Sequence, residues 1–202
     1  RKIIQEFCEE LNLKDEPIGF LSTALTLEQY GFYKELCELR AMDETCLSSL
    51  WQDRPAKKYY PISDYPISFA GKSRDAKIQD LQMTCQKAGV DGVFLNESNG
   101  IAWLLNIRSV TRPITPAPHT FAYIPQKGKP ILWAHRQEWP KDVIGDIDWR
   151  SYDQVMIDMQ EIAKNQTLWI DRDNISYAHA QGFYEAGIKC HTESLPIERW
   201  KA

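Results

Sequence analysis

The sequence predicts an α/β fold in which a mixed β-sheet is flanked by helices. From residue 73 onward, segments with apolar residues at helical spacing alternate with short apolar runs typical of buried strands. A turn at 127–129 joins two of these runs as a hairpin, which adds an antiparallel pair to the sheet. The composition, 43% hydrophobic and 26% charged, is that of a globular protein with a core.

The first 55 residues contain too few elements to close a core alone. Residues 1–12 carry an apolar stripe and are expected to be the end of a helix, and residues 18–21 are expected to form a buried strand. A second helix is expected to begin at Thr26, because Gln29 completes a capping box with it. The chain begins with Arg1 and shows no secretion signal. We therefore expect a piece of a longer protein, or one that is incomplete at its start.

A stiff linker is expected next, since Pro55, Pro61 and Pro66 remove backbone donors and favour extended conformations. The expected parts of the chain are the C-terminal part of a first domain over 1–55, the linker over 56–72, a complete second domain over 63–195 and a segment leading out of it over 196–202.

The second domain is expected to begin with an amphipathic helix over 73–88, which Gly89 ends. The later elements follow from the same patterns. Strands are expected over 90–95, 119–124, 130–134, 151–155, 167–171 and 188–191, and helices over 97–107, 156–164 and 174–186.

Charge and hydropathy exclude two classes of partner. The net charge of −4 and the dispersed basic residues argue against a nucleic-acid surface. No apolar run approaches the roughly 20 residues that a membrane-spanning helix needs. We therefore expect no nucleic acid and no membrane as partners.

The usual catalytic and metal motifs are missing from the sequence. The four histidines are scattered, and the five cysteines lack paired spacing, which favours reduced thiols in a cytoplasmic protein. Asp171 and Asp173 could bind a cation, but capping of a following helix is the better interpretation. Neither a Gly-x-Ser-x-Gly elbow nor a phosphate-binding loop is present. We expect no catalytic residue and no metal ligand in this chain.

The segment 101–118 has the strongest pattern of a functional site. An apolar helix ends near Asn106 and Arg108, and a loop stiffened by three prolines and carrying Arg112 follows. A rigid exposed loop is a good place to present an arginine to a ligand or partner. The alternative is structural: Asn106 caps the helix and Arg108 binds its last carbonyls.

Several stretches, taken in order, resemble one family. Residues 50–55 (LWQDRP) resemble the Trp-x-Asp-Arg-Pro signature of the three-domain Xaa-Pro aminopeptidases, aminopeptidase P. Residues 101–108 (IAWLLNIR) resemble the IAWLxNxR segment of that family, and residues 115–116 and 119–122 fit the same alignment without a gap. Pro196-Ile197 and Lys201-Ala202 resemble the stretch that leads into the catalytic domain.

The sequence departs from the family pattern at three places. Ser109-Val110-Thr111 replaces the usual Gly-Ser-Asp, Ile114 replaces a histidine, and Leu195 replaces an asparagine. These differences bear on the detailed role of the loop and leave the resemblance intact.

The resemblance implies a creatinase/prolidase N-terminal domain-like fold and a role outside catalysis. In the family, a C-terminal pita-bread domain uses two Asp, one His and two Glu to bind two divalent metal ions, usually manganese, and removes the N-terminal residue that precedes proline. No stretch of this sequence matches those ligands. This chain alone is therefore expected to be inactive, with its own catalytic domain, proline-containing peptides and a second copy in a homodimer as partners.

The resemblance also assigns roles to single residues. A loop that controls substrate access or binds a partner is implied for Asn106, Arg108, Arg112, Thr115 and Pro116. Packing between domains is implied for Trp51, Asp53, Arg54 and Trp103.

Two alternatives remain open. The gene could encode a stand-alone creatinase-N-like module that binds peptides or a partner and has no enzymatic activity. The parent could also be another pita-bread hydrolase, such as a prolidase or a creatinase-like amidinohydrolase; the Trp-x-Asp-Arg-Pro linker favours the three-domain enzyme.

Overall fold

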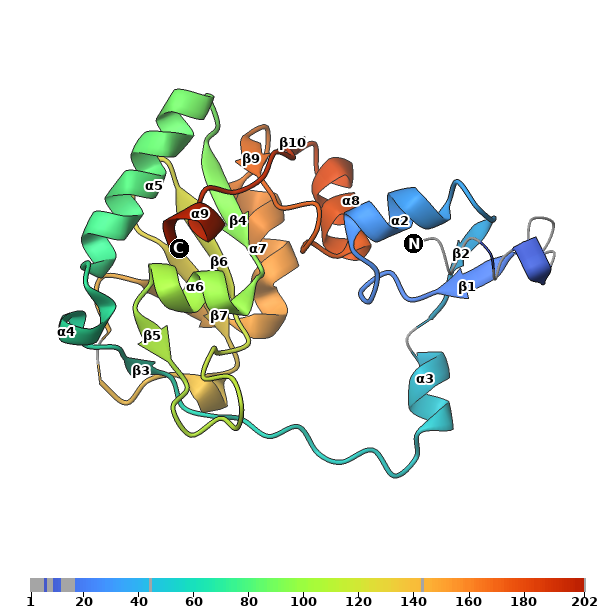
Figure 1. The fold of residues 1–202 in the computed structure, drawn as a ribbon, viewed down its shortest axis with the longest axis horizontal. Helices are drawn as coiled ribbons and strands as arrows, with labels where there is room; N and C mark the ends of the chain where they lie inside the picture. Colours follow the sequence, from blue (N-terminus) through green and yellow to red (C-terminus); the bar gives the residue numbers. More distant parts are fainter. Residues whose placement is uncertain (1–5, 7–8, 12–16, 44, 143, 202) are drawn as a thin grey trace. The chain divides into compact units, whose positions relative to one another are not determined.

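The computed structural model describes residues 1–202 apart from 1–5, 7–8, 12–16, 44, 143 and 202 (Figure 1). The described chain divides into two units. Unit 1 contains residues 1–57 and 172–181, and unit 2 contains residues 58–171 and 182–202. The helix expected over 1–12 falls largely outside the described residues. The domain boundaries proposed from the sequence stay a prediction.

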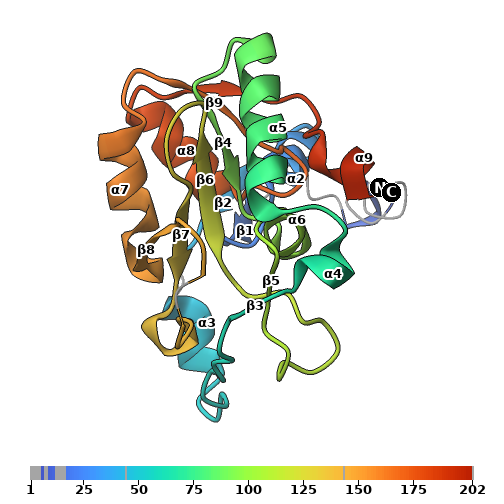
Figure 2. The same cartoon turned by 90° about the vertical axis from the view of Figure 1, so that its left-hand side faces the viewer.

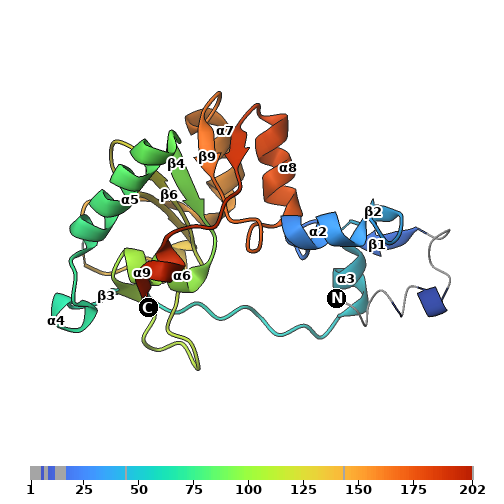
Figure 3. The same cartoon turned by 45° about the horizontal axis from the view of Figure 1, so that its top comes forward.

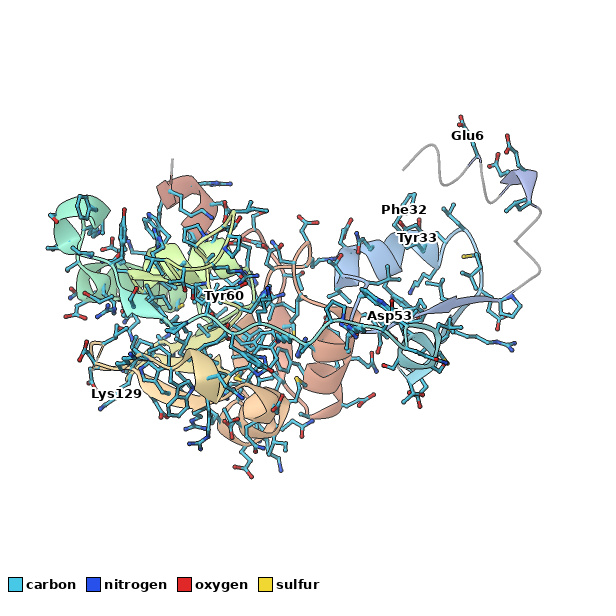
Figure 4. All side chains as sticks on the ribbon, turned by 90° about the horizontal axis from the view of Figure 1, so that it is seen from below. Glu6, Phe32, Tyr33, Asp53, Tyr60 and Lys129 are labelled. Atoms are coloured by element: carbon cyan, nitrogen blue, oxygen red, sulfur yellow. The ribbon has the colours of Figure 1, made fainter. Side chains whose placement is uncertain are left out.

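Unit 1 is built on two short parallel strands, β1 (Ile18–Phe20) and β2 (Leu39–Ala41). Helix α2 (Leu27–Tyr33) begins with the expected capping box, in which Thr26 and Gln29 exchange side-chain and backbone hydrogen bonds. Phe32 and Tyr33, at the end of this helix, have ring centroids 5.5 Å apart (Figure 4). Helix α3 (Thr45–Leu50), which the sequence analysis missed, follows.

A later segment, residues 172–181, belongs to the same unit. The amide of Leu27 donates to the carbonyl of Ile175, and the amide of Tyr177 donates to the carbonyl of Leu25, at 2.9 and 2.8 Å. The rings of Tyr30 and Tyr177 stack with centroids 3.9 Å apart. Residues far apart in the sequence therefore share one small core.

Unit 2 contains a mixed sheet of six strands in the order β10-β9-β4-β6-β7-β8, flanked by helices (Figures 1 and 2). The β4–β6 and β6–β7 pairs are antiparallel and the remaining pairs are parallel. This confirms the predicted fold class. The strands are β4 (Gly92–Leu95), β6 (Phe121–Pro125), β7 (Ile131–Ala134), β8 (Asp148–Ser151), β9 (Thr167–Trp169) and β10 (Lys189–His191).

The helices of unit 2 lie on both faces of the sheet (Figure 2). The longer ones are α5 (Arg74–Ala88), α6 (Ser98–Leu104), α7 (Val155–Ile162) and α8 (Tyr177–Glu185), which begins in unit 1. The C-terminal helix is α9 (Ile197–Lys201), and short 3₁₀ turns lie at Arg136–Glu138 and Tyr152–Gln154. As predicted, Gly89 ends α5 in the left-handed conformation, at φ 68°.

Successive side chains of the central strands point to opposite faces of the sheet, so apolar side chains pack on both faces. Val93 and Leu95 join a cluster that includes Leu81 of α5 and Leu104 of α6. The intervening Phe94 faces the other way, and its ring centroid lies 5.0 Å from that of Phe183 in α8. Because both faces are buried, these strands read as continuous apolar runs.

Several predicted boundaries differ from the structure. The helix expected over 174–186 lies at Tyr177–Glu185, and the strand expected over 167–171 ends at Trp169. The strand expected over 151–155 lies at Asp148–Ser151, and residues 152–154 form a 3₁₀ turn. This edge strand is half-buried throughout and contains an Asp148–Arg150 ion pair, so it lacks the apolar run of a central strand. The helix expected over 97–107 ends at Leu104, because Asn106 adopts a left-handed conformation with φ 48°.

The chain after Asn106 forms a small ribbon with part of the predicted linker. Strand β5 (Ile107–Arg108) pairs antiparallel with β3 (Ser63–Asp64), and helix α4 (Ile67–Ala70) follows β3. Residues 63–70 are therefore ordered elements of unit 2.

Candidate functional site

Residues 109–118, which form most of the loop between β5 and β6, contain three of the predicted access-loop residues. It projects from the end of the β3–β5 ribbon, away from the six-stranded sheet (Figure 3). Its base is closed by backbone hydrogen bonds: the amide of Ser109 donates to the carbonyl of Pro116 at 2.7 Å, and the amide of Arg112 donates to the carbonyl of Ser109 at 2.9 Å. The loop is thus a compact unit with a defined stem. We name residues 109–118 the access loop.

The tip of the access loop presents apolar side chains to solvent. Val110 is 68% exposed, Ile114 is fully exposed, and Thr115 and Pro116 are also exposed. Ile114 has φ 71°, a conformation that a β-branched residue rarely adopts. Strained backbone of this kind is common at functional loops.

Arg112, predicted to be presented to a ligand, braces the access loop from within. Its Nη1 donates to the carbonyl of Ala117 at 2.8 Å, and its Nη2 contacts Nε2 of His119. The guanidinium therefore joins the two sides of the loop.

Arg108 also binds backbone oxygens. Its Nη1 donates to the carbonyls of Ala102 and Ile107, at 2.7 and 2.8 Å, and its guanidinium carbon lies 4.4 Å from the ring centroid of Tyr65. Burial lowers the pKa of Arg108, and Tyr65 opposes that effect. This is the helix-capping arrangement that the sequence analysis left open as the alternative.

Asn106 is 5% exposed and is held on three sides. Its Oδ1 accepts from Nζ of Lys77 at 2.8 Å, its Nδ2 donates to the carbonyl of Lys72 at 3.0 Å, and its carbonyl accepts from the amide of Tyr65 at 2.8 Å. These contacts maintain the left-handed backbone from which β5 and the access loop depart.

Sequence reasoning missed two cations at this position. Arg74 donates from Nε to the carbonyl of Leu105 at 2.5 Å, and Lys77 donates from Nζ to the carbonyl of Trp103 at 2.8 Å. With Arg108, three cations thus bind carbonyls at the C-terminal end of α6, where the helix dipole is negative. The available signal was that Lys77, Leu81 and Cys85 are spaced by four residues, which places Lys77 on the apolar face of α5.

The four residues implied in packing between domains lie in different units. Trp51, Asp53 and Arg54 belong to unit 1 and are exposed, and Figure 4 shows Asp53. The guanidinium carbon of Arg54 lies 5.5 Å from the ring centroid of Trp51, which is 54% exposed. Trp103 belongs to unit 2, where it is partly buried against that unit's own core.

The described part of the chain also has hollows outside the access loop. Two hollows of about 250 and 230 Å³ flank Pro140 and Lys141, one beside Ile62 and the other between Trp139 and Trp149. Among the described residues, no group of three or more His, Cys, Asp or Glu side chains is placed to hold a metal ion. The helices that the structure describes include none with the length and apolarity to span a bilayer.

Curated relatives of this chain are aminopeptidases of the Xaa-Pro type. A probable Xaa-Pro aminopeptidase P of Leptosphaeria maculans is 28% identical over 63% of this chain, and aminopeptidase P1 of Arabidopsis thaliana is 29% identical over 49% of it. The aligned regions are 22% and 16% of those two proteins. The chain therefore spans about a fifth of the length of the curated relatives it matches.

A solved structure shares the fold. The X-prolyl aminopeptidase of Caenorhabditis elegans, a cytosolic enzyme with a di-nuclear active site, matches 98% of this chain with a TM-score of 0.82. The sequence identity is 15%, and the match covers 34% of that enzyme. Residues 53–202 match the family described as the creatinase/prolidase N-terminal domain. Since this match covers most of the chain and all of unit 2, the chain belongs to the creatinase/prolidase N-terminal domain family.

Proposed function

We propose that this chain is the non-catalytic N-terminal region of a cytoplasmic Xaa-Pro aminopeptidase. The observation that carries the proposal is that relatives 28% and 29% identical to it are named Xaa-Pro aminopeptidase P and aminopeptidase P1, and that each aligns over a minor part of its own length. The fold shared with the C. elegans enzyme supports the same assignment.

In this proposal the hydrolysis takes place in a separate catalytic domain of the same polypeptide. That domain holds two divalent metal ions, manganese, and removes the N-terminal residue of peptides that have proline second. The present region binds that domain and contributes to a homodimer. Trp51, half-exposed beside Arg54, offers apolar surface for packing between domains.

The access loop is the part of this region that limits which peptides enter. Its stem is closed by hydrogen bonds, and its tip presents Val110, Ile114, Thr115 and Pro116 to solvent. A rigid tip with apolar side chains selects peptides by steric exclusion, and it needs no charged group aimed at the peptide. Asn106, Arg108 and Arg112 then support the loop and leave peptide contact to the tip.

The test uses the intact protein that contains this chain. With Mn²⁺ present, it is expected to release the first residue from peptides with proline second, and a chelator is expected to abolish that activity. Ile114→Gly removes the tip side chain, and glycine readily adopts the positive φ that the backbone has at this position. It is expected to raise kcat/KM for long peptides relative to short ones by threefold or more.

A matched control is Ile157→Gly, which removes a half-exposed isoleucine of α7, distant in sequence from the loop. Equal kinetics of Ile114→Gly and wild type across peptide lengths would refute the role of the loop. Absence of Xaa-Pro hydrolysis by the intact protein would refute the assignment itself and favour a binding module.

A further inference from the structure

Buried polar groups are concentrated at the base of the access loop. Among the described residues, the buried polar or charged residues are Lys77, Asn106, Ser109, Thr120 and Glu138. Lys77 and Asn106 are hydrogen-bonded to each other, and Ser109 begins the access loop and donates from Oγ to the carbonyl of Tyr60 at 3.2 Å. Buried polar groups that are satisfied in this way specify one local structure.

Lys77 is the unusual member of this group. It is 2% exposed, and none of the ion pairs found among the described residues includes it. Its ammonium instead donates to the carbonyl of Trp103 and to Oδ1 of Asn106, and lies 4.1 Å from the ring centroid of Trp103. An apolar side chain would fill this volume without the cost of desolvating a charge, so what the ammonium adds is directed hydrogen bonding.

The two hydrogen bonds from the ammonium of Lys77 end on residues that control where the chain leaves α6. Trp103 lies in the last turn of α6, and Asn106 is the left-handed residue at which the chain leaves that helix. One ammonium thus joins the helix end to the residue that sets the departure of β5. The other side-chain bond of Asn106, to the carbonyl of Lys72, ties it to the segment just before α5.

We propose that Lys77 is the positioning residue of the access loop: from within the core, its ammonium holds Asn106 in the left-handed conformation that directs residues 107–118 away from the sheet. This inference rests on the proposed function, since it supplies the rigidity which that function requires of the loop. Lys77 touches no peptide and acts through Asn106.

The first measurement is amide hydrogen exchange on Lys77→Met, whose side chain has a similar length and no charge. The amides of Ser109 and Arg112, which close the loop stem, are expected to exchange tenfold or more faster than in wild type. The amides of β4 and β6, which open only when the whole unit unfolds, are expected to accelerate by a smaller factor than the loop amides. The control is Lys87→Met on the exposed side of the same helix, which should change neither group.

A second variant tests whether Lys77 acts through Asn106. Asn106→Gly removes the acceptor while permitting the left-handed backbone. If Lys77 acts through Asn106, the double variant will accelerate exchange in the loop no more than the stronger single variant does. Should Lys77→Met fail to fold, the exchange measurement is made on Asn106→Gly, which removes the acceptor of the same hydrogen bond.

Three results would overturn the inference: unchanged loop exchange in the Lys77 variant, faster exchange of equal size throughout unit 2, or additive effects in the double variant. Kinetics of the intact enzyme then separate this inference from the proposed function. A loosened loop is expected to change KM for long peptides at least threefold with kcat for short peptides unchanged. A loosened loop with unchanged KM would retain Lys77 as the positioning residue and refute the role of the loop in substrate access.

Discussion

Replacement of Asn106 by alanine or glycine tests the energetics of the left-handed turn that precedes the access loop. Alanine removes two buried hydrogen bonds, one from the ammonium of Lys77 and one to the carbonyl of Lys72. The bond from the charged group contributes about 2 kcal/mol and the neutral one about 1 kcal/mol. A left-handed conformation costs alanine about 1 kcal/mol more. Asn106→Ala should therefore destabilise the fold by about 4 kcal/mol.

Glycine separates the backbone contribution from the hydrogen bonds. It adopts φ 48° without a steric penalty, so Asn106→Gly should cost about 3 kcal/mol. Asn165 is the matched control, because it is also left-handed, with φ 63°, and is exposed. Asn165→Ala should cost about 1 kcal/mol, for the backbone alone.

The assay is equilibrium urea unfolding of wild type and the three variants, followed by tryptophan fluorescence and far-UV circular dichroism. The difference between Asn106→Ala and Asn165→Ala measures the buried hydrogen bonds and should be about 3 kcal/mol. Equal costs at the two positions would refute the reasoning, because they would show that the bonds of Asn106 contribute nothing to stability.

Three further predictions concern the core of unit 2. Burial raises the pKa of Cys85 from 9.0 to about 11, so the stability that its thiol contributes is present below pH 9 and lost as the pH rises through 11. The stability difference between wild type and Cys85→Ala should narrow by about 2 kcal/mol from pH 8 to pH 11, measured by urea unfolding at each pH. Gly92→Ala should cost about 2 kcal/mol or more, since the added Cβ would lie 2.8 Å from the carbonyl oxygen of Ile124. Asp158→Ala should cost about 2 kcal/mol, because the buried indole N–H of Trp133 donates to that carboxylate at 2.7 Å; chemical unfolding checks both values.

Each of these predictions has a contrary result. A constant difference in unfolding free energy between wild type and Cys85→Ala across the pH range would show that the thiol has the same pKa in the folded and unfolded states. A free energy of unfolding of Gly92→Ala within error of wild type would show that β4 and β6 move apart at little cost. Asp146→Ala, which removes a pair with the exposed Lys129, is the control for Asp158→Ala, and equal effects of the two would contradict the buried bond.

The elements with strong local signals were predictable from the sequence. The helix beginning at Ser73 has a cap, an apolar stripe and a terminal Gly89, and each follows from short-range chemistry. The capping box of Thr26 and Gln29 is equally local. The central strands were found because burial on both faces makes them apolar throughout.

The elements that depend on distant partners were not predictable. Strand β8 is half-buried at the edge of the sheet, so its sequence shows no apolar run. The ribbon of β3 and β5 has two residues in each strand and exists because the chain turns at Asn106. Such short elements are specified by tertiary contacts, which a sequence window does not contain.

The site residues chosen from the sequence stay a prediction, and the side chains that support them were missed. The sequence singled out Asn106, Arg108 and Arg112 and left capping open as an alternative, and the structure shows each of the two arginines bound to backbone carbonyls. Lys77 and Arg74 were missed because a lysine or arginine in a helix is usually solvated. Their contact with the end of α6 joins positions that are 26 and 31 residues apart.

The central claim is that this chain is the N-terminal region of a larger aminopeptidase. The most direct test is the intact mass of the native protein, purified from its own cells. The account predicts a mass larger than 23.4 kDa by at least one further domain, on the order of 200 residues or more. A native mass near 23.4 kDa would contradict the account, since the polypeptide would then contain no catalytic domain.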